Sequence, residues 1–115
     1  MTTIEELISL QKEFDGKHQS WFRWDEEISE KNIQVLEYLL LATLGELGEA
    51  ANITKKVIRG DFSFAEAKER IGEEVIDVLI YALKLSYQLK LDVRSEYLKK
   101  MEKNKNRFQK YENGK

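Results

Sequence analysis

The chain has 115 residues, of which 42% are hydrophobic and 35% charged, and its formal net charge is −2 at pH 7. This composition indicates a single globular domain, residues 1–115, with a modest core and a heavily solvated surface. The absence of cysteine excludes disulfides and thiolate metal sites, and the absence of proline favours long helices. We expect a cytoplasmic protein without a membrane segment, because the longest apolar run, residues 38–44, is too short to cross a bilayer and residues 1–10 lack the features of a signal peptide.

The first half of the chain predicts two helices separated by an aromatic stretch. The first helix covers residues 3–14 and is expected to end at Asp15-Gly16. Residues 17–29 predict a short helix or an ordered loop. A long helix then runs from residue 30 to residue 59, where Gly60 followed by Asp61 is typical of a C-terminal stop.

The second half predicts two further helices. Ser63 and Glu66 have the spacing of a capping box, which marks the start of a helix that runs to about residue 89. Asp92 is a suitable N-cap for the last helix, residues 93–111. Because short connections make neighbouring helices antiparallel, the fold class we predict is all-α, an antiparallel arrangement like a four-helix bundle.

Two pairs of carboxylates interrupt the apolar faces of the two central helices. Glu46 and Glu49 are three residues apart in one helix, as are Glu74 and Asp77 in the other, so each pair shares one helix face. Four anions in a dry seam would repel one another and would each lose hydration worth several kcal/mol. Either some are protonated or a cation holds them together, and oxygen-only ligands favour Mg²⁺ or Mn²⁺.

The two pairs are also predicted to lie at the same height in the helical hairpin. Glu49 precedes the turn by about 12 residues and Glu74 follows it by about 12, which places both roughly 18 Å from the turn. On a helical wheel Glu74 lies about 60° from the apolar stripe, whereas Glu73 lies more than twice as far round, beside Lys84 on the solvent side. We therefore predict Glu74 as the ligand, with Glu73 a surface charge or an indirect partner of the site.

Two simpler interpretations of the acidic residues are less favoured. A single Glu-x-x-Glu pair is common on any acidic helix, and only the matched pair on the partner helix favours a metal site. A di-iron carboxylate centre requires Glu-x-x-His motifs. The single histidine, His18, lies far from both pairs in the sequence, so the di-iron interpretation fails.

With these motifs the chain resembles the all-α nucleotide pyrophosphohydrolases, often called MazG-like. The resemblance spans about residues 36–108, and it rests on residues 45–52 (GELGEAAN), 73–79 (EEVIDVL) and 103–107 (KNKNR). It implies a hydrolase that uses Mg²⁺, with Mn²⁺ as a substitute, to cleave a nucleoside triphosphate into the monophosphate and pyrophosphate. It also implies a homodimer or homotetramer, and a role in removing unwanted nucleotides or controlling the nucleotide pool.

The resemblance implies roles for named residues as well. The metal ligands would be Glu46, Glu49, Glu74 and Asp77, with Glu49 as the candidate catalytic base that accepts a proton from the attacking water. Substrate-binding residues would include three side chains of the basic tail that contact phosphate or sugar: Lys103, Asn104 and Arg107.

Three other side chains have two interpretations each. Lys56 could reach the same phosphates, or it could be a solvated lysine near a helix end. Trp24 could stack on the nucleobase, or it could pack with Trp21 and Phe22 in a core or an oligomer interface. His18 is interpreted as polar surface or as a base or phosphate contact.

Two other classes of function compete with the enzyme. One is a non-enzymatic helical interaction module whose acidic seam contacts a partner. The other is a nucleic-acid binder that uses the basic tail, but net acidity and the lack of a recognition motif argue against it, and no nucleic-acid partner is expected. Base preference, sugar preference and the number of metal ions stay open.

Overall fold

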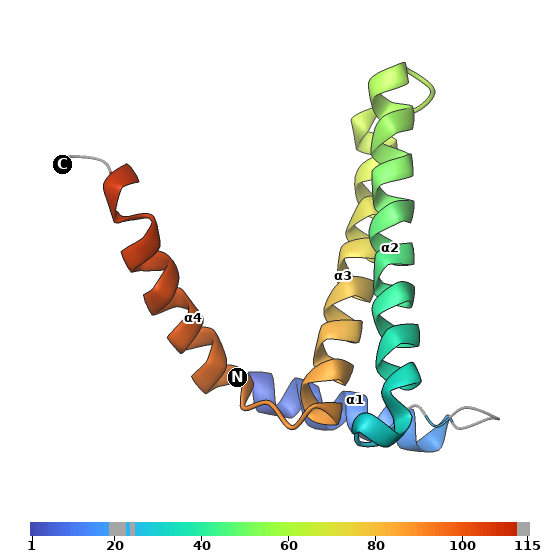
Figure 1. Cartoon of the computed structure of the whole chain (residues 1–115). Coiled ribbons are helices and arrows are strands. Elements are labelled where there is room, and N and C mark those ends of the chain that lie inside the picture. Colours follow the sequence, from blue (N-terminus) through green and yellow to red (C-terminus); the bar gives the residue numbers. More distant parts are fainter. Residues whose placement is uncertain (19–22, 24, 113–115) are drawn as a thin grey trace.

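The computed structural model describes residues 1–18, 23 and 25–112. Six helical elements follow one another: α1 (Ile4–Lys17), the 3₁₀ helix η1 (Glu30–Asn32), α2 (Ile33–Arg59), α3 (Phe64–Gln88), α4 (Val93–Arg107) and the 3₁₀ helix η2 (Gln109–Tyr111). Every regular element in these residues is helical, which confirms the all-α prediction (Figure 1).

Helices α2 and α3 form a long antiparallel hairpin, and its turn has the predicted chemistry (Figure 1). Gly60 adopts a left-handed conformation with φ 92°, and its N–H donates to the carbonyl groups of Lys56 and Val57. The Ser63 hydroxyl accepts from the Glu66 N–H while the Glu66 carboxylate accepts from the Ser63 N–H. This capping box starts α3 immediately after the turn, so that the two helices run back alongside each other.

The buried apolar core is small. Its members come from the two helices of the hairpin, α2 and α3, and from no part of α1 or α4 among the described residues: Val35, Leu39, Ile53, Ala67 and Leu83. Val35, Leu39 and Ile53 are the buried residues of α2, and they lie on the apolar face that Glu46 and Glu49 were predicted to interrupt. The face of α3 that carries Glu74 is partly buried, and it packs against this face of α2. Glu49, however, is exposed.

Helix α1 crosses the base of the hairpin and packs against the C-terminal half of α3 (Figure 1). It extends to Lys17, so the prediction that Asp15-Gly16 ends it was wrong. The reason is tertiary, because the Asp15 carboxylate accepts hydrogen bonds from side chains of α1 and α3. The segment after α1 is joined to the end of α3, where Gln88 donates from Nε2 to the Glu26 carbonyl at 3.0 Å.

Helix α4 diverges from the hairpin, so the four helices do not form a four-helix bundle within one chain (Figure 1). A turn that includes Lys90 at φ 57° redirects the chain after α3. The start of α4 is tied to α1 by two hydrogen bonds from the Arg94 guanidinium to the Glu5 carboxylate, at 2.8 and 3.2 Å. None of the described helices combines the length and apolar composition that a membrane span requires.

Candidate metal centre

Three of the four predicted carboxylates meet where α2 and α3 lie side by side. Glu46 of α2 and Glu74 and Asp77 of α3 each offer an oxygen, and these oxygens all lie within 4.8 Å of one another. Atom Oε2 of Glu74 is buried and has no hydrogen-bond partner. A buried carboxylate oxygen without a partner is costly, so this arrangement suits a bound cation.

The proximity of these groups changes their protonation. Hydrogen bonding with the Glu74 side chain, followed by burial, raises the pKa of Glu46. Burial, followed by the charge of Glu46, raises the pKa of Asp77. Carboxyl groups that resist ionisation beside one another would release protons when a divalent cation binds.

Tyr81 follows Asp77 by one turn of α3 and belongs to the same site. Burial raises the pKa of the Tyr81 phenol, and the charge of Glu46 raises it further. Its hydroxyl therefore stays protonated at neutral pH, as a hydrogen-bond donor beside the acidic group.

The remaining predicted acidic residue stands apart. Glu49 lies on α2 one turn beyond Glu46, but it is exposed and outside the group of three. Glu73 is likewise exposed and lies outside the group that includes Glu74.

The predicted substrate contacts are not brought to this group within one chain. Lys103, Asn104 and Arg107 lie on α4, which diverges from the hairpin (Figure 1). Lys56 lies near the hairpin turn, with Nζ 5.9 Å from the centre of the Phe62 ring. Trp24, with its aromatic neighbours at 21 and 22, lies outside the described residues.

A cavity of about 280 Å³ opens beside the acidic group, between α1 and the hairpin. Glu46, Asp77 and Tyr81 line it from the hairpin, and so does Lys84, which follows Asp77 by two turns of α3. From α1 the lining side chains are those near its C-terminal end, Gln11, Phe14 and Asp15, followed by His18.

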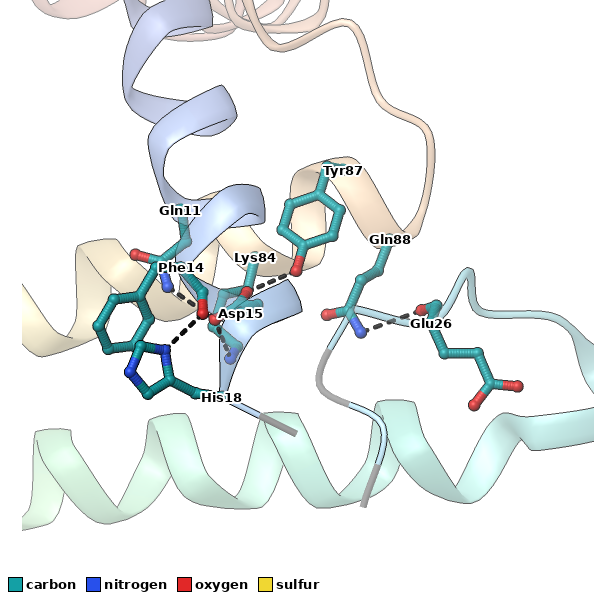
Figure 2. A network of polar contacts seen from close by, with 8 residues as sticks. All are labelled: Gln11, Phe14, Asp15, His18, Glu26, Lys84, Tyr87 and Gln88. Atoms are coloured by element: carbon teal, nitrogen blue, oxygen red, sulfur yellow. Dashed lines mark hydrogen bonds and ion pairs between the residues drawn. The ribbon is translucent and has the colours of Figure 1, made fainter. Parts of the chain in front are cut away.

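Asp15 is the centre of a buried polar network that the sequence did not predict (Figure 2). Its Oδ1 accepts from Gln11 Nε2 at 2.9 Å and from Lys84 Nζ at 3.0 Å, and its Oδ2 accepts from the Tyr87 hydroxyl. Asp15 is 3% exposed and Lys84 is 7% exposed. The prediction that Lys84 faces solvent was therefore wrong, because α1 covers this part of α3.

One available signal pointed towards this network. Ile4, Ile8, Gln11 and Asp15 have the alternating four- and three-residue spacing of a single helix face, so two polar residues stood on the inward stripe of α1. Nothing in the sequence identified their partners on α3.

His18 lies at the end of α1 and takes no part in the acidic group. Its Nδ1 is 2.7 Å from the Phe14 carbonyl oxygen, and its ring stacks on the Phe14 ring with centroids 4.0 Å apart (Figure 2). The pair forms an aromatic wall on the α1 side of the cavity.

Comparisons of the chain with protein-family models, with curated proteins and with solved structures give no significant match. The resemblance to MazG-like enzymes therefore rests on the sequence motifs.

Proposed function

We propose that this protein is a metal-dependent hydrolase that cleaves a nucleoside triphosphate into the monophosphate and pyrophosphate. The observation that carries the proposal is the convergence of Glu46, Glu74 and Asp77 from two antiparallel helices, with one Glu74 oxygen buried and unpaired. The motif resemblance supplies the substrate class, and the adjoining cavity gives a substrate access to these carboxylates.

The donor set fits Mg²⁺, with Mn²⁺ as a substitute. Both are hard cations that prefer oxygen, and Mg²⁺ is usually bound by one or a few carboxylates together with water and substrate phosphates. Glu46, Glu74 and Asp77 would hold the ion. When bound, it would neutralise the polyphosphate and lower the pKa of a water molecule.

The reaction also needs a group that accepts a proton from water and a donor that binds a phosphate oxygen, and we assign these roles to two neighbouring side chains. Glu49 is exposed one helical turn from Glu46, and we assign it the role of general base, the acceptor of a proton from the attacking water. The Tyr81 hydroxyl is a protonated donor that can bind a phosphate oxygen.

We further propose that the functional unit is a homodimer or homotetramer. The accessible surface of the chain is 9042 Å². A compact monomer of this mass would expose about 6,600 Å². The excess, roughly 2,400 Å², is within the area that obligate oligomers bury. In such an assembly α4 of a neighbouring chain would supply Lys103, Asn104 and Arg107 to the phosphates.

The test is pyrophosphate release from a panel of deoxynucleoside and nucleoside triphosphates in the presence of Mg²⁺. We expect Glu49→Gln to lower kcat by about 10²- to 10⁴-fold. Glu46→Gln and Asp77→Asn should lower it by on the order of 100-fold or more and weaken Mn²⁺ binding. Glu73→Gln is the matched control, because Glu73 is an exposed carboxylate beside Glu74 and outside the acidic group. Activity that survives in all three site variants would contradict the assignment.

A helical interaction module is the second candidate, and one observation favours it. Large apolar side chains recur on the outer face of α2, where Leu40, Leu44 and Leu47 are 47%, 61% and 49% exposed. A folded protein that neither binds Mn²⁺ nor hydrolyses any nucleotide would favour this alternative over the enzyme.

A further inference from the structure

The network around Asp15 lies beside the acidic group and shares its cavity. Asp77, Tyr81 and Lys84 follow one another on α3 at spacings of four and three residues, so one face of the helix carries all three. All three line the cavity, and Asp15 lines it from α1. One face of α3 therefore contributes Asp77 to the acidic group and, two turns further along, Lys84 to the contact with α1.

The ion pair between Asp15 and Lys84 is expected to add little to the free energy of unfolding compared with an apolar pair in the same place. Its side chains are 3% and 8% exposed, so both charges have lost most of their hydration. The attraction between two such charges roughly offsets this loss, and a well-packed apolar pair is often as stable. What the ionic pair adds is direction, since charged hydrogen bonds fix the relative positions of the atoms that they join.

Elsewhere in the described residues the contact between α1 and α3 is largely apolar, apart from Lys12 Nζ, which lies 5.8 Å from the centre of the Tyr87 ring. It includes a groove lined by apolar side chains, and those of α1 are partly open to solvent: Leu7 is 37% exposed, Leu10 64% and Phe14 57%. Apolar contacts of this kind tolerate small shifts of one helix along another, because they are not directional. The Asp15 network, by contrast, joins α1 to α3 through hydrogen bonds from Lys84 and Tyr87, which are directional.

We propose that Asp15 and Lys84 are positioning residues of the site. They hold the C-terminal half of α1 on α3, and they act through Gln11 and Phe14, which α1 presents to the cavity beside Asp77. This inference rests on the proposed function, since it concerns the cavity in which the nucleotide would bind. A shift of α1 would alter the fit of substrate while the carboxylates of the hairpin stay together.

The decisive variant is the double substitution Asp15→Leu with Lys84→Met, which replaces the ion pair by apolar side chains of similar size. We expect KM for the nucleotide that is hydrolysed most efficiently to rise about tenfold, while kcat changes by less than about threefold. A loss of substrate binding raises KM without lowering kcat. Mn²⁺ affinity should stay within about twofold of wild type, because the ligands are on the hairpin. The matched control is Glu13→Gln with Lys17→Gln, which removes an exposed ion pair of 3.0 Å from the same helix.

A second measurement does not depend on activity. The chain contains no cysteine, so cysteines at the exposed positions Ser9 of α1 and Lys68 of α3 can carry spin labels. With labelled chains diluted in unlabelled chain, the distance distribution between the labels should broaden or shift in the double variant and stay unchanged in the control.

The two measurements separate the possible failures. An unchanged distance distribution, or an unchanged KM in an active double variant, would overturn the positioning role. A loss of kcat without a rise in KM would show a merely structural role and would also overturn it. A wild-type chain that hydrolyses no nucleotide would refute the proposed function, and the distance measurement would still decide whether the pair holds α1 in place.

Discussion

Glu46, Glu74 and Asp77 place three acidic side chains within reach of one cation, and their protonation follows from this proximity. The ordinary pKa values of 4.5 for Glu46 and 3.8 for Asp77 are both raised in the folded protein. A carboxyl group with a raised pKa binds its proton more tightly in the folded than in the unfolded state. Its contribution to stability is complete below the unfolded pKa and is lost as pH rises through the folded pKa.

The first prediction concerns this pH dependence. In EDTA, wild type should lose stability relative to Glu46→Gln as pH rises from about 4 to 7, because the variant lacks one of the repelling charges. Mg²⁺ at neutral pH should stabilise wild type more than the variant, since the ion binds only the folded carboxylates. Urea unfolding at a series of pH values measures both effects. The same pH dependence in both proteins would contradict the prediction.

The second prediction concerns the buried charge of Lys84. Asp15→Ala removes the carboxylate that accepts a hydrogen bond from the Lys84 ammonium, which is 7% exposed. Removing one member of a buried pair typically costs about 3–5 kcal/mol in the free energy of unfolding. Urea denaturation should show this loss, whereas Glu13→Ala, from an exposed pair, should change stability by less than about 1 kcal/mol. Equal effects of the two substitutions would contradict the prediction.

Residue spacing predicted the acidic group but not the network around Asp15. Glu46, Glu74 and Asp77 were found because helix geometry and the distance from a short turn determine which side chains of a hairpin meet. The position of Lys84 was wrong because a helical wheel treats a face as uniform along the helix. In the structure, Glu73 stays exposed on that face while Lys84, eleven residues later, is covered by α1.

At the scale of the elements, the hairpin was predictable because its signals are local. Gly60 and the Ser63–Glu66 capping box lie within the connection itself and act without help from the rest of the chain. The end of α1 and the course of α4 were not predictable in this way. The first depends on contacts of Asp15 with α3, and the second on a turn at Lys90, a residue type that gives no signal for a left-handed conformation.

The third prediction tests the hairpin turn with one substitution at two sites. Gly60→Ala should destabilise the protein by about 1 kcal/mol, because φ of 92° is strained for a residue with a Cβ atom. Gly72→Ala should instead stabilise it by up to about 1 kcal/mol, because Gly72 lies within α3 and a Cβ there meets no atom within 4 Å in the chain. Thermal or urea unfolding gives both values. Effects of the same sign would contradict the prediction at the turn.

At the scale of the whole molecule, the chain is more extended than its length requires. Its radius of gyration is 17.7 Å. A compact domain of this length would have about 13 Å. Apolar side chains of α4 account for part of the exposed surface, with Tyr97 and Leu98 each 62% exposed and Met101 48% exposed.

The fourth prediction follows from this surface. Light scattering should give the mass of a dimer or tetramer of the 13.6 kDa chain at micromolar concentration. Leu98→Asp with Met101→Asp should lower that mass, because charges would enter an apolar interface. The same variant should lose hydrolysis if α4 completes the site of a neighbouring chain, while Lys99→Gln with Lys100→Gln is a control on the same helix with the same change in net charge. A monomeric wild type would contradict the assembly.

The attachment of α1 to α3 has a consequence for the order of folding. Asp15 and Lys84 are 69 residues apart in the sequence, whereas α2 and α3 are joined by a short turn. Contacts between near neighbours in sequence form faster than distant ones, because closing a short loop loses less entropy. During folding, the acidic side chains of the hairpin would therefore come together before α1 packs against α3 and closes one side of the cavity. Stopped-flow measurements should find that Asp15→Ala mainly accelerates unfolding, whereas Ile53→Val in the hairpin slows folding. A site whose ligands assemble first is open to its cation while the chain is still folding.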